Sequence, residues 1–102
     1  MRSKYNAKKT IVDDITFDSG KEASRYGDLM IMQRAGIISN LILQPPFDIV
    51  MCGIKCGSYR ADFLYVEEGE AVVEDVKGFK TAMYRFKKKL VEAQYGFLIH
   101  ET

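Results

Sequence analysis

Histidine and cysteine are scarce in this chain of 102 residues, which narrows the metal and redox chemistry open to it. One histidine and two cysteines leave too few ligands for a structural zinc site within the chain. Cys52 and Cys56 enclose Gly-Ile-Lys, which is not the Cys-x-x-Cys spacing of a redox motif. We therefore expect two free thiols around a turn, and a structural role for His100.

Long apolar runs are also missing. No stretch approaches the roughly 20 residues that a membrane span needs. Residues 1–9 hold four basic side chains and no acid, but no apolar stretch follows them, so they do not resemble a secretory signal. We expect residues 1–9 to form a basic flexible arm and the protein to stay in the cytoplasm.

An excess of charge of one sign is absent as well, because 15 basic and 14 acidic residues give a formal net charge of +1. Any binding to nucleic acid would have to come from a local basic patch. What the chain does have is an ordinary apolar content of 47%, enough for one hydrophobic core at this length. We predict a single domain over residues 10–102.

The first helix is predicted from its capping residues. Ser19 and Glu22 form the Ser-x-x-Glu pattern of a capping box, and Gly36 suits the left-handed position after a helix that ends near residue 35. Residues 29–32 are all apolar, so we expect the second half of this helix to be well buried. The stripe expected to face the core is Ala23, Tyr26, Met30 and Gln33.

The remaining elements follow from apolar periodicity and turn residues. A second helix is predicted from residue 80 to Gly96, with a core-facing stripe of Met83, Phe86, Leu90 and Ala93. The predicted strands are a small hairpin over residues 10–17 and four strands over 47–51, 59–66, 72–78 and 97–100. Two prolines separate the first of these four from an extended lead-in over 41–44, and 52–58 is predicted as a turn. Apart from the small hairpin, the order is α-β-β-β-α-β, an α/β fold.

Charged side chains stand out on two of these strands. Asp75 and Lys77 lie two residues apart and share one face of their strand, while Glu74 points to the other face. An acid and an ammonium group on a buried strand are costly unless something uses them. The preceding strand carries Asp62, and the polar turn at 67–70 would pair the two strands. The arrangement is typical of a metal-dependent site that cleaves phosphodiesters; the alternative is a surface ion pair on an edge strand, which stabilises little.

These residues carry a family resemblance. Asp62, followed by Asp75-Val-Lys77 and preceded by Glu22 on a helix, resembles the PD-(D/E)XK nuclease superfamily. The predicted element order is similar to that superfamily's restriction-endonuclease-like core, a mixed β-sheet flanked by helices. The sequence departs from the pattern at Asp75, where glutamate is commoner, and Glu74 stands beside it. A small phage and prophage family of Holliday-junction resolvases and endonucleases is more closely similar, over residues 17–22 with Tyr26, 43–45, 61–63 and 73–78.

The resemblance implies a set of catalytic residues. Asp62 and Asp75 would bind Mg²⁺ or Mn²⁺, with the Val76 backbone carbonyl as a further ligand, and Mg²⁺ accepts few carboxylates plus water and phosphate oxygens. Lys77 would orient the attacking water or stabilise the charge that develops on the phosphate. Glu22 would hold the metal directly or through water, although the capping box explains Glu22 completely as a helix cap.

A nucleic-acid substrate also requires contacts to phosphates. The candidates for DNA contact are Gln44, Lys80, Arg85, Lys87 and Lys88, together with Lys89. The cations of the second helix could equally be the solvated face of an amphipathic helix. Gln44 could equally be the polar end of a strand before two prolines.

The function predicted from these observations is a Mg²⁺- or Mn²⁺-dependent DNA endonuclease. The resemblance adds a preference for Holliday junctions or other branched DNA, and a phage-encoded protein that acts in the host cytoplasm. Cutting two strands of a junction needs two sites, so a homodimer is expected. The alternative is a non-catalytic DNA-binding or phage packaging-associated protein that keeps the nuclease fold.

Overall fold

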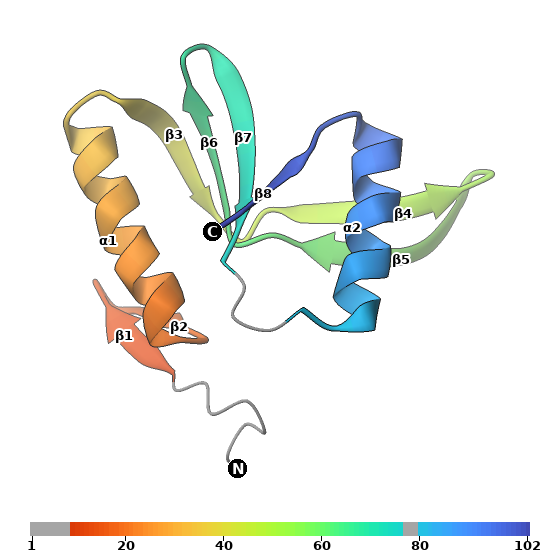
Figure 1. The fold of residues 1–102 in the computed structure, drawn as a ribbon, viewed down its shortest axis with the longest axis horizontal. Coiled ribbons are helices and arrows are strands. Elements are labelled where there is room, and N and C mark those ends of the chain that lie inside the picture. Colours follow the sequence, from red (N-terminus) through yellow and green to blue (C-terminus); the bar gives the residue numbers. More distant parts are fainter. Residues whose placement is uncertain (1–8, 77–79) are drawn as a thin grey trace.

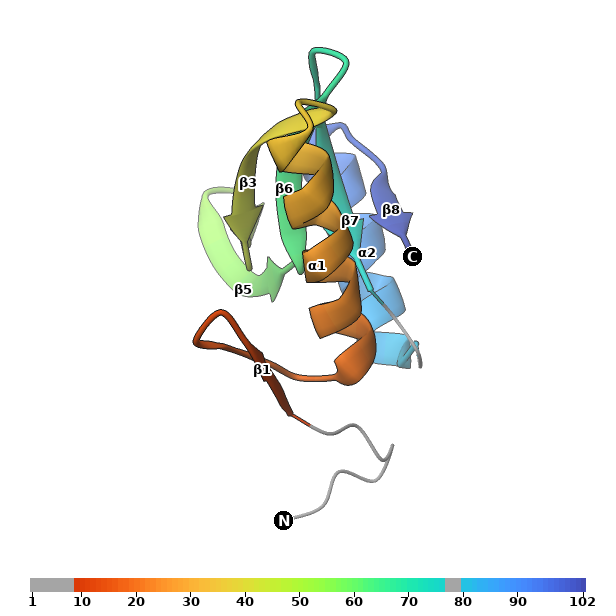
Figure 2. The ribbon, with the colours of Figure 1, turned by 90° about the vertical axis from the view of Figure 1, so that its left-hand side faces the viewer.

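The computed structural model describes residues 9–76 and 80–102. Its largest sheet has four strands, in the order β3 (Ile38–Leu43), β6 (Phe63–Glu67), β7 (Glu70–Asp75) and β8 (Ile99–Glu101). Neighbouring strands are antiparallel except β7 and β8, which are parallel and are connected through helix α2 (Ala82–Tyr95). The fold is therefore mixed α/β, with α1 and α2 on opposite sides of this sheet (Figures 1 and 2).

Helix α1 (Gly20–Arg34) begins and ends where the sequence predicts. The Ser19 hydroxyl accepts a hydrogen bond from the Glu22 N–H at 3.1 Å, which is the N-cap half of the predicted capping box. The Glu22 carboxylate accepts from the backbone N–H of Asp18 at 3.4 Å rather than from that of Ser19. After the helix, Gly36 takes a φ of +80°, as expected of a left-handed terminal position.

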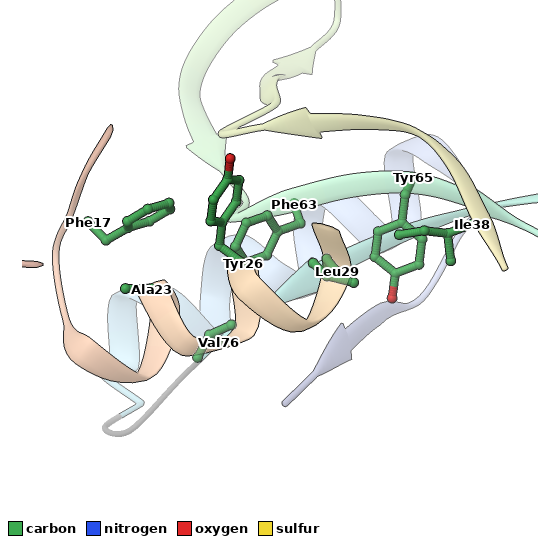
Figure 3. Close-up of a cluster of buried hydrophobic side chains, with 8 residues drawn as sticks. All are labelled: Phe17, Ala23, Tyr26, Leu29, Ile38, Phe63, Tyr65 and Val76. Carbon is green, nitrogen blue, oxygen red and sulfur yellow. The ribbon is translucent and has the colours of Figure 1, made fainter. Parts of the chain in front are cut away.

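One face of the sheet packs against α1. The prediction for this helix is confirmed at Ala23 and Tyr26, but its second half is not buried all round, because Ile31 is 65% exposed. A run of four apolar residues covers a full helical turn, so one of them must point away from the sheet. The core on this side, drawn in Figure 3, consists of Phe17, Ala23, Tyr26, Leu29, Ile38, Phe63, Tyr65 and Val76.

Helix α2 covers the other face of the sheet, but of its predicted core-facing stripe only Leu90 packs against the core. Its buried residues are Tyr84 and Val91, whereas Met83 and Phe86 are 61% and 58% exposed. Two apolar stripes run along this helix, and periodicity alone does not say which of them faces inward. The predicted ends are correct: Thr81 is the N-cap, and Gly96 has a φ of +75°.

Three of the strand predictions are wrong in the middle of the chain. Residues 41–43 of the predicted lead-in belong to the full strand β3, and most of the predicted turn at 52–58 belongs to strand β5 (Ile54–Arg60). That strand pairs with β4 (Pro46–Met51) as a separate hairpin whose turn is Cys52 and Gly53, both at positive φ. The predicted strand over 59–66 is broken at residues 61–62, where the chain passes from this hairpin into the sheet. Glycine and serine in β5 obscure its strand pattern.

Hydrogen bonds connect the β4–β5 hairpin to the end of α2. The backbone N–H of Val50 donates to the Gln94 side-chain oxygen at 2.9 Å, and the Gln94 side-chain nitrogen donates to the Asp48 carbonyl at 3.0 Å. The Tyr95 hydroxyl donates to the same carbonyl at 2.8 Å. Both cysteines of the hairpin are free and exposed, as predicted.

A second hairpin precedes α1 and is correctly predicted. Strand β1 (Thr10–Val12) pairs with β2 (Ile15–Phe17) around Asp13 and Asp14, both at positive φ. Taking this hairpin and β4–β5 apart, the order of elements is α1-β3-β6-β7-α2-β8, which matches the predicted α-β-β-β-α-β with β3 in place of the strand at 47–51. Of the predicted basic arm, residues 1–8 lie outside the described part of the chain.

Candidate acidic site at the end of the sheet

Three predicted acids come from three separate elements. Glu22 lies in the first turn of α1, Asp62 in the two-residue link between β5 and β6, and Asp75 at the end of β7. Because β6 and β7 are antiparallel, with Phe63 opposite Glu74, the start of one strand meets the end of the other. The fold therefore brings residues that are 13 and 40 positions apart in the sequence to one end of the sheet.

Asp62 is held in place by its backbone and its side chain. Its backbone N–H donates to the Glu74 carbonyl at 3.1 Å, and its carbonyl accepts from the Gln44 N–H at 2.9 Å. The Asp62 Oδ2 atom accepts from the backbone N–H of Val76 at 2.7 Å. The carboxyl is thus fixed beside the chain that leaves β7, as the sequence predicts for a hairpin carrying both acids.

The side chains of Glu22 and Asp75 both lie close enough to the Asp62 carboxyl to shift its pKa. Burial raises the pKa of Asp62 to about 6, and the contact with Glu22 acts in the same direction, while the contacts with Asp75 and the Val76 N–H lower it. Two carboxylates this close repel each other, so one of them retains a proton above its usual pKa. A cation placed between them would replace that proton.

Asp75 is fully buried, with an exposed fraction of 0%, and Glu22 is 5% exposed. The Tyr59 hydroxyl, which comes from β5, donates to Asp75 Oδ2. Nothing in the sequence indicates this contact, because the predicted strand over 59–66 carries both Tyr59 and Asp62, whereas in the structure Tyr59 belongs to a separate hairpin.

A pocket of about 190 Å³ opens beside these acids. Its polar lining comes from three predicted residues, Glu22, Gln44 and Asp62. The rest of its lining is Ile15, Thr16, Phe17 and Leu43, so the β1–β2 hairpin forms one wall. Gln44 is exposed and follows β3 at a positive φ of 53°. The geometry therefore keeps Gln44 as a candidate beside the acids.

The sequence predicts only that Glu74 faces away from the site. In the structure, Glu74 forms a buried ion pair with Arg25. It is fully buried, and Arg25 donates to both of its carboxylate oxygens, through Nε at 2.7 Å and Nη2 at 3.0 Å. The hydroxyls of Tyr65 and Thr102 also donate to it, at 2.7 and 3.0 Å. Burial acts to raise the pKa of Glu74, but the bonds from Arg25, Tyr65 and Thr102 bring it below its usual value. The sequence contains one indication of this ion pair: Arg25, a possible partner for a buried acid, lies about one helical turn after Glu22.

The predicted cations are not all placed alike. Lys77 lies outside the described residues. Lys80 forms an ion pair with Glu101 at 3.1 Å, and Lys88 forms one with Glu92 at 3.0 Å. Arg85 and Lys89 are exposed and Lys87 is partly buried along α2. Lys80 and Lys88 therefore pair with acids other than the three of the candidate site.

The described residues, 9–76 and 80–102, contain no group of three or more histidine, cysteine, aspartate or glutamate side chains arranged as a metal site. Glu22 and Asp75 nevertheless each lie near Asp62, so the end of the sheet gathers three carboxyl groups without forming such a site. Such a set offers only oxygen ligands, which suit Mg²⁺ or Mn²⁺ better than softer metals. The Val76 carbonyl as a further ligand stays a prediction.

By fold and site, the molecule is a mixed α/β protein with an acid-lined pocket at one end of its sheet. The chain belongs to the family described as "Protein of unknown function (DUF1064)", whose model matches residues 2–100. No curated protein and no solved structure matches the chain. Within the described residues, neither helix is long and apolar enough to cross a membrane.

Proposed function

We propose that this protein is a Mg²⁺- or Mn²⁺-dependent DNA endonuclease with a restriction-endonuclease-like core. The observation that carries the proposal is that Glu22 and Asp62 line one open pocket, with Asp75 close by at the paired ends of β6 and β7. The element order α1-β3-β6-β7-α2-β8 supports it, because the acids stand at the paired ends of β6 and β7, as in the nucleases that the sequence resembles.

The three carboxylates would hold the cation, and the hydrogen bonds that they accept fit that role. Asp75 is fixed by the Tyr59 hydroxyl and Asp62 by the Val76 N–H, so two of the three are oriented by neighbouring donors. A bound Mg²⁺ or Mn²⁺ would lower the pKa of a bound water and neutralise charge on the scissile phosphate. Lys77 would orient the attacking water, and Gln44 at the rim of the pocket would contact the substrate.

Phosphates farther along the substrate would contact the cations of α2. Arg85 and Lys87 form no ion pair among the described residues, so they would bind phosphates without giving up a partner. Lys80 and Lys88 would first have to leave Glu101 and Glu92. Because surface ion pairs stabilise little, a polyanion could replace these partners at a small cost in free energy.

The test is cleavage of a four-way junction, a flap and a linear duplex, each with Mg²⁺, with Mn²⁺ and with neither ion. We expect metal-dependent cleavage, with branched DNA preferred as the resemblance implies. Asp62→Asn, Asp75→Asn and Lys77→Ala should each abolish cleavage while DNA binding persists. DNA binding without cleavage of any substrate would favour the alternative, a non-catalytic DNA-binding or packaging-associated protein.

A homodimer is part of this proposal. Its support is the unpredicted exposure of Met83 and Phe86 on α2. Their stripe continues along the helix to a groove of about 270 Å³ between α2 and β4, lined by Ile49, Val50, Met51, Leu90, Ala93 and Gln94. Contiguous exposed apolar surface of this kind marks sites of association.

Sedimentation equilibrium tests the dimer. Phe86→Glu should shift the wild-type dimer to a monomer, because it places a charge on the apolar stripe. Ile54→Glu at the tip of the β4–β5 hairpin is the matched control, since Ile54 is 67% exposed but lies off that stripe. A wild-type protein that sediments as a monomer at all concentrations would contradict the proposal.

A further inference from the structure

We propose that Tyr59 is a positioning residue that orients the Asp75 carboxylate for a divalent cation. The inference rests on the metal site proposed above, and it assigns a role to a residue of the β4–β5 hairpin rather than of the sheet. Its hydroxyl donates to Asp75 Oδ2 at a place where both residues are buried, Tyr59 at 6% and Asp75 at 0% exposure.

The Tyr59 ring cannot easily turn away from Asp75. It stacks on Phe47, with ring centroids 6.4 Å apart, and it also contacts Tyr84 at 6.2 Å. Phe47 is packed in turn against Tyr95 and Phe97, at 5.3 and 5.4 Å. Because aromatic neighbours from α2 and the hairpin enclose the ring, the direction of its hydroxyl is set before any ligand arrives.

The chemistry of the pair fits a carboxylate that binds a cation. A tyrosine hydroxyl has an ordinary pKa of about 10, so it is protonated at neutral pH and acts as the donor in the bond to Asp75. A donor on one oxygen favours the ionised carboxylate and fixes its plane. Asp75 is therefore held from the β5 side, while Asp62 approaches it from the start of β6.

The alternative is that Tyr59 only fills the core between the sheet, the hairpin and α2. The two roles belong to different atoms, since the ring makes the packing contacts and the hydroxyl makes the bond to Asp75. Tyr59→Phe separates them, because it keeps the ring and removes the hydroxyl. Tyr26→Phe is the matched control: Tyr26 is equally buried, but its hydroxyl donates to Asp13 at 3.1 Å, away from Asp75.

The experiment measures Mn²⁺ binding to the whole protein by electron paramagnetic resonance, with urea unfolding in the absence of metal as the check on folding. We expect Tyr59→Phe to remain folded and to bind Mn²⁺ roughly 10- to 100-fold more weakly, the usual cost of losing a partner of a metal ligand. Tyr26→Phe should bind Mn²⁺ as the wild type does. Cleavage by Tyr59→Phe should recover as the metal concentration rises.

A double variant tests the route through Asp75. In the Asp75→Asn background, adding Tyr59→Phe should change Mn²⁺ binding no further, because the hydroxyl acts only through that carboxylate. Equal Mn²⁺ affinity in wild type and Tyr59→Phe, or full additivity in the double variant, would overturn the role of Tyr59 and leave the proposed nuclease standing. A wild-type protein that binds no Mn²⁺ would overturn both.

Discussion

At the scale of single residues, Asp62 should make stability depend on pH. Its pKa is raised from 3.8 to about 6 in the folded protein, so the folded state binds more protons than the unfolded state between these values. The stabilising contribution is complete below about pH 4 and is lost as the pH rises through 6. Asp62→Asn should therefore be more stable than wild type at pH 8 but not at pH 4, as measured by urea midpoints in metal-free buffer. Asp28→Asn, exposed on α1, should show no such difference.

Glu74 should prove important for folding rather than for cleavage itself. Glu74→Gln removes the charge that Arg25 contacts through two bonds, and the lost partner of a buried pair typically costs about 3 kcal/mol. The expected result is a large fall in the urea midpoint with the metal requirement of the remaining folded protein little changed. Glu70→Gln, exposed at the start of β7, should lie within about 0.5 kcal/mol of wild type.

One substitution separates the two roles proposed for Glu22, a helix cap and a metal ligand. Glu22→Gln keeps a side-chain oxygen for the Asp18 N–H and should lose mainly a helix-dipole interaction of roughly 0.3–1 kcal/mol. If Glu22 holds metal, the same change should sharply raise the Mn²⁺ concentration needed for cleavage. Ser19→Ala should instead cost about 1 kcal/mol as a lost N-cap and leave that concentration alone. Full activity of Glu22→Gln at limiting Mn²⁺ would return Glu22 to a capping role.

At the scale of elements, substitutions on α2 can test the proposed DNA binding separately from the proposed cleavage. Replacing Arg85 and Lys87 with alanine should weaken binding and flatten its salt dependence by roughly one unit of logarithmic slope per lost phosphate contact. The cleavage rate of bound substrate should change little. Lys55→Ala is the control, because Lys55 lies on the β4–β5 hairpin and pairs with Asp48 at 3.3 Å. The measurement is fluorescence anisotropy over a range of salt concentrations without metal.

The sequence predicts individual elements well where local chemistry decides them. Ser19, Gly36 and Gly96 act within a few residues of themselves, so the ends of both helices are correct. The prediction of which residues of α2 face the core is mostly wrong, because packing against the β4–β5 hairpin decides it and no local sequence pattern predicts that hairpin. Strand β5 was missed for the same reason: it is stabilised by pairing with β4 rather than by its own composition.

At the scale of the whole molecule, the candidate site was predictable only in part. Alternation along one strand placed Asp75 and Glu74 on opposite faces, and the polar turn placed Asp62 near them. The partners that fix these carboxylates come from elsewhere in the fold: Tyr59 from the hairpin, Arg25 from α1 and Thr102 from the residue after β8. Such contacts join distant parts of the chain, and a single sequence carries no record of them.

Metal should stabilise the whole fold if the three carboxylates bind it together. A ligand that binds only the folded state adds about 2.7 kcal/mol at 100 times its dissociation constant. We expect Mn²⁺ to raise the melting temperature of wild type at neutral pH, and excess chelator to reverse the rise. Asp62→Asn should show little response in differential scanning calorimetry. An equal rise in wild type and Asp62→Asn would place the binding elsewhere.

The hydrogen bonds from Gln94 to β4 affect whether a strand from another molecule can pair with the edge of β4. An outer strand with free N–H and carbonyl groups is a template on which another chain can add a strand, and fibrils grow in that way. The side-chain amide of Gln94 engages the outward groups of Val50 and Asp48 as a neighbouring strand would. At Val50 and Asp48 this edge is therefore closed to sheet extension, because a strand from a second molecule could pair with these two groups only by displacing Gln94.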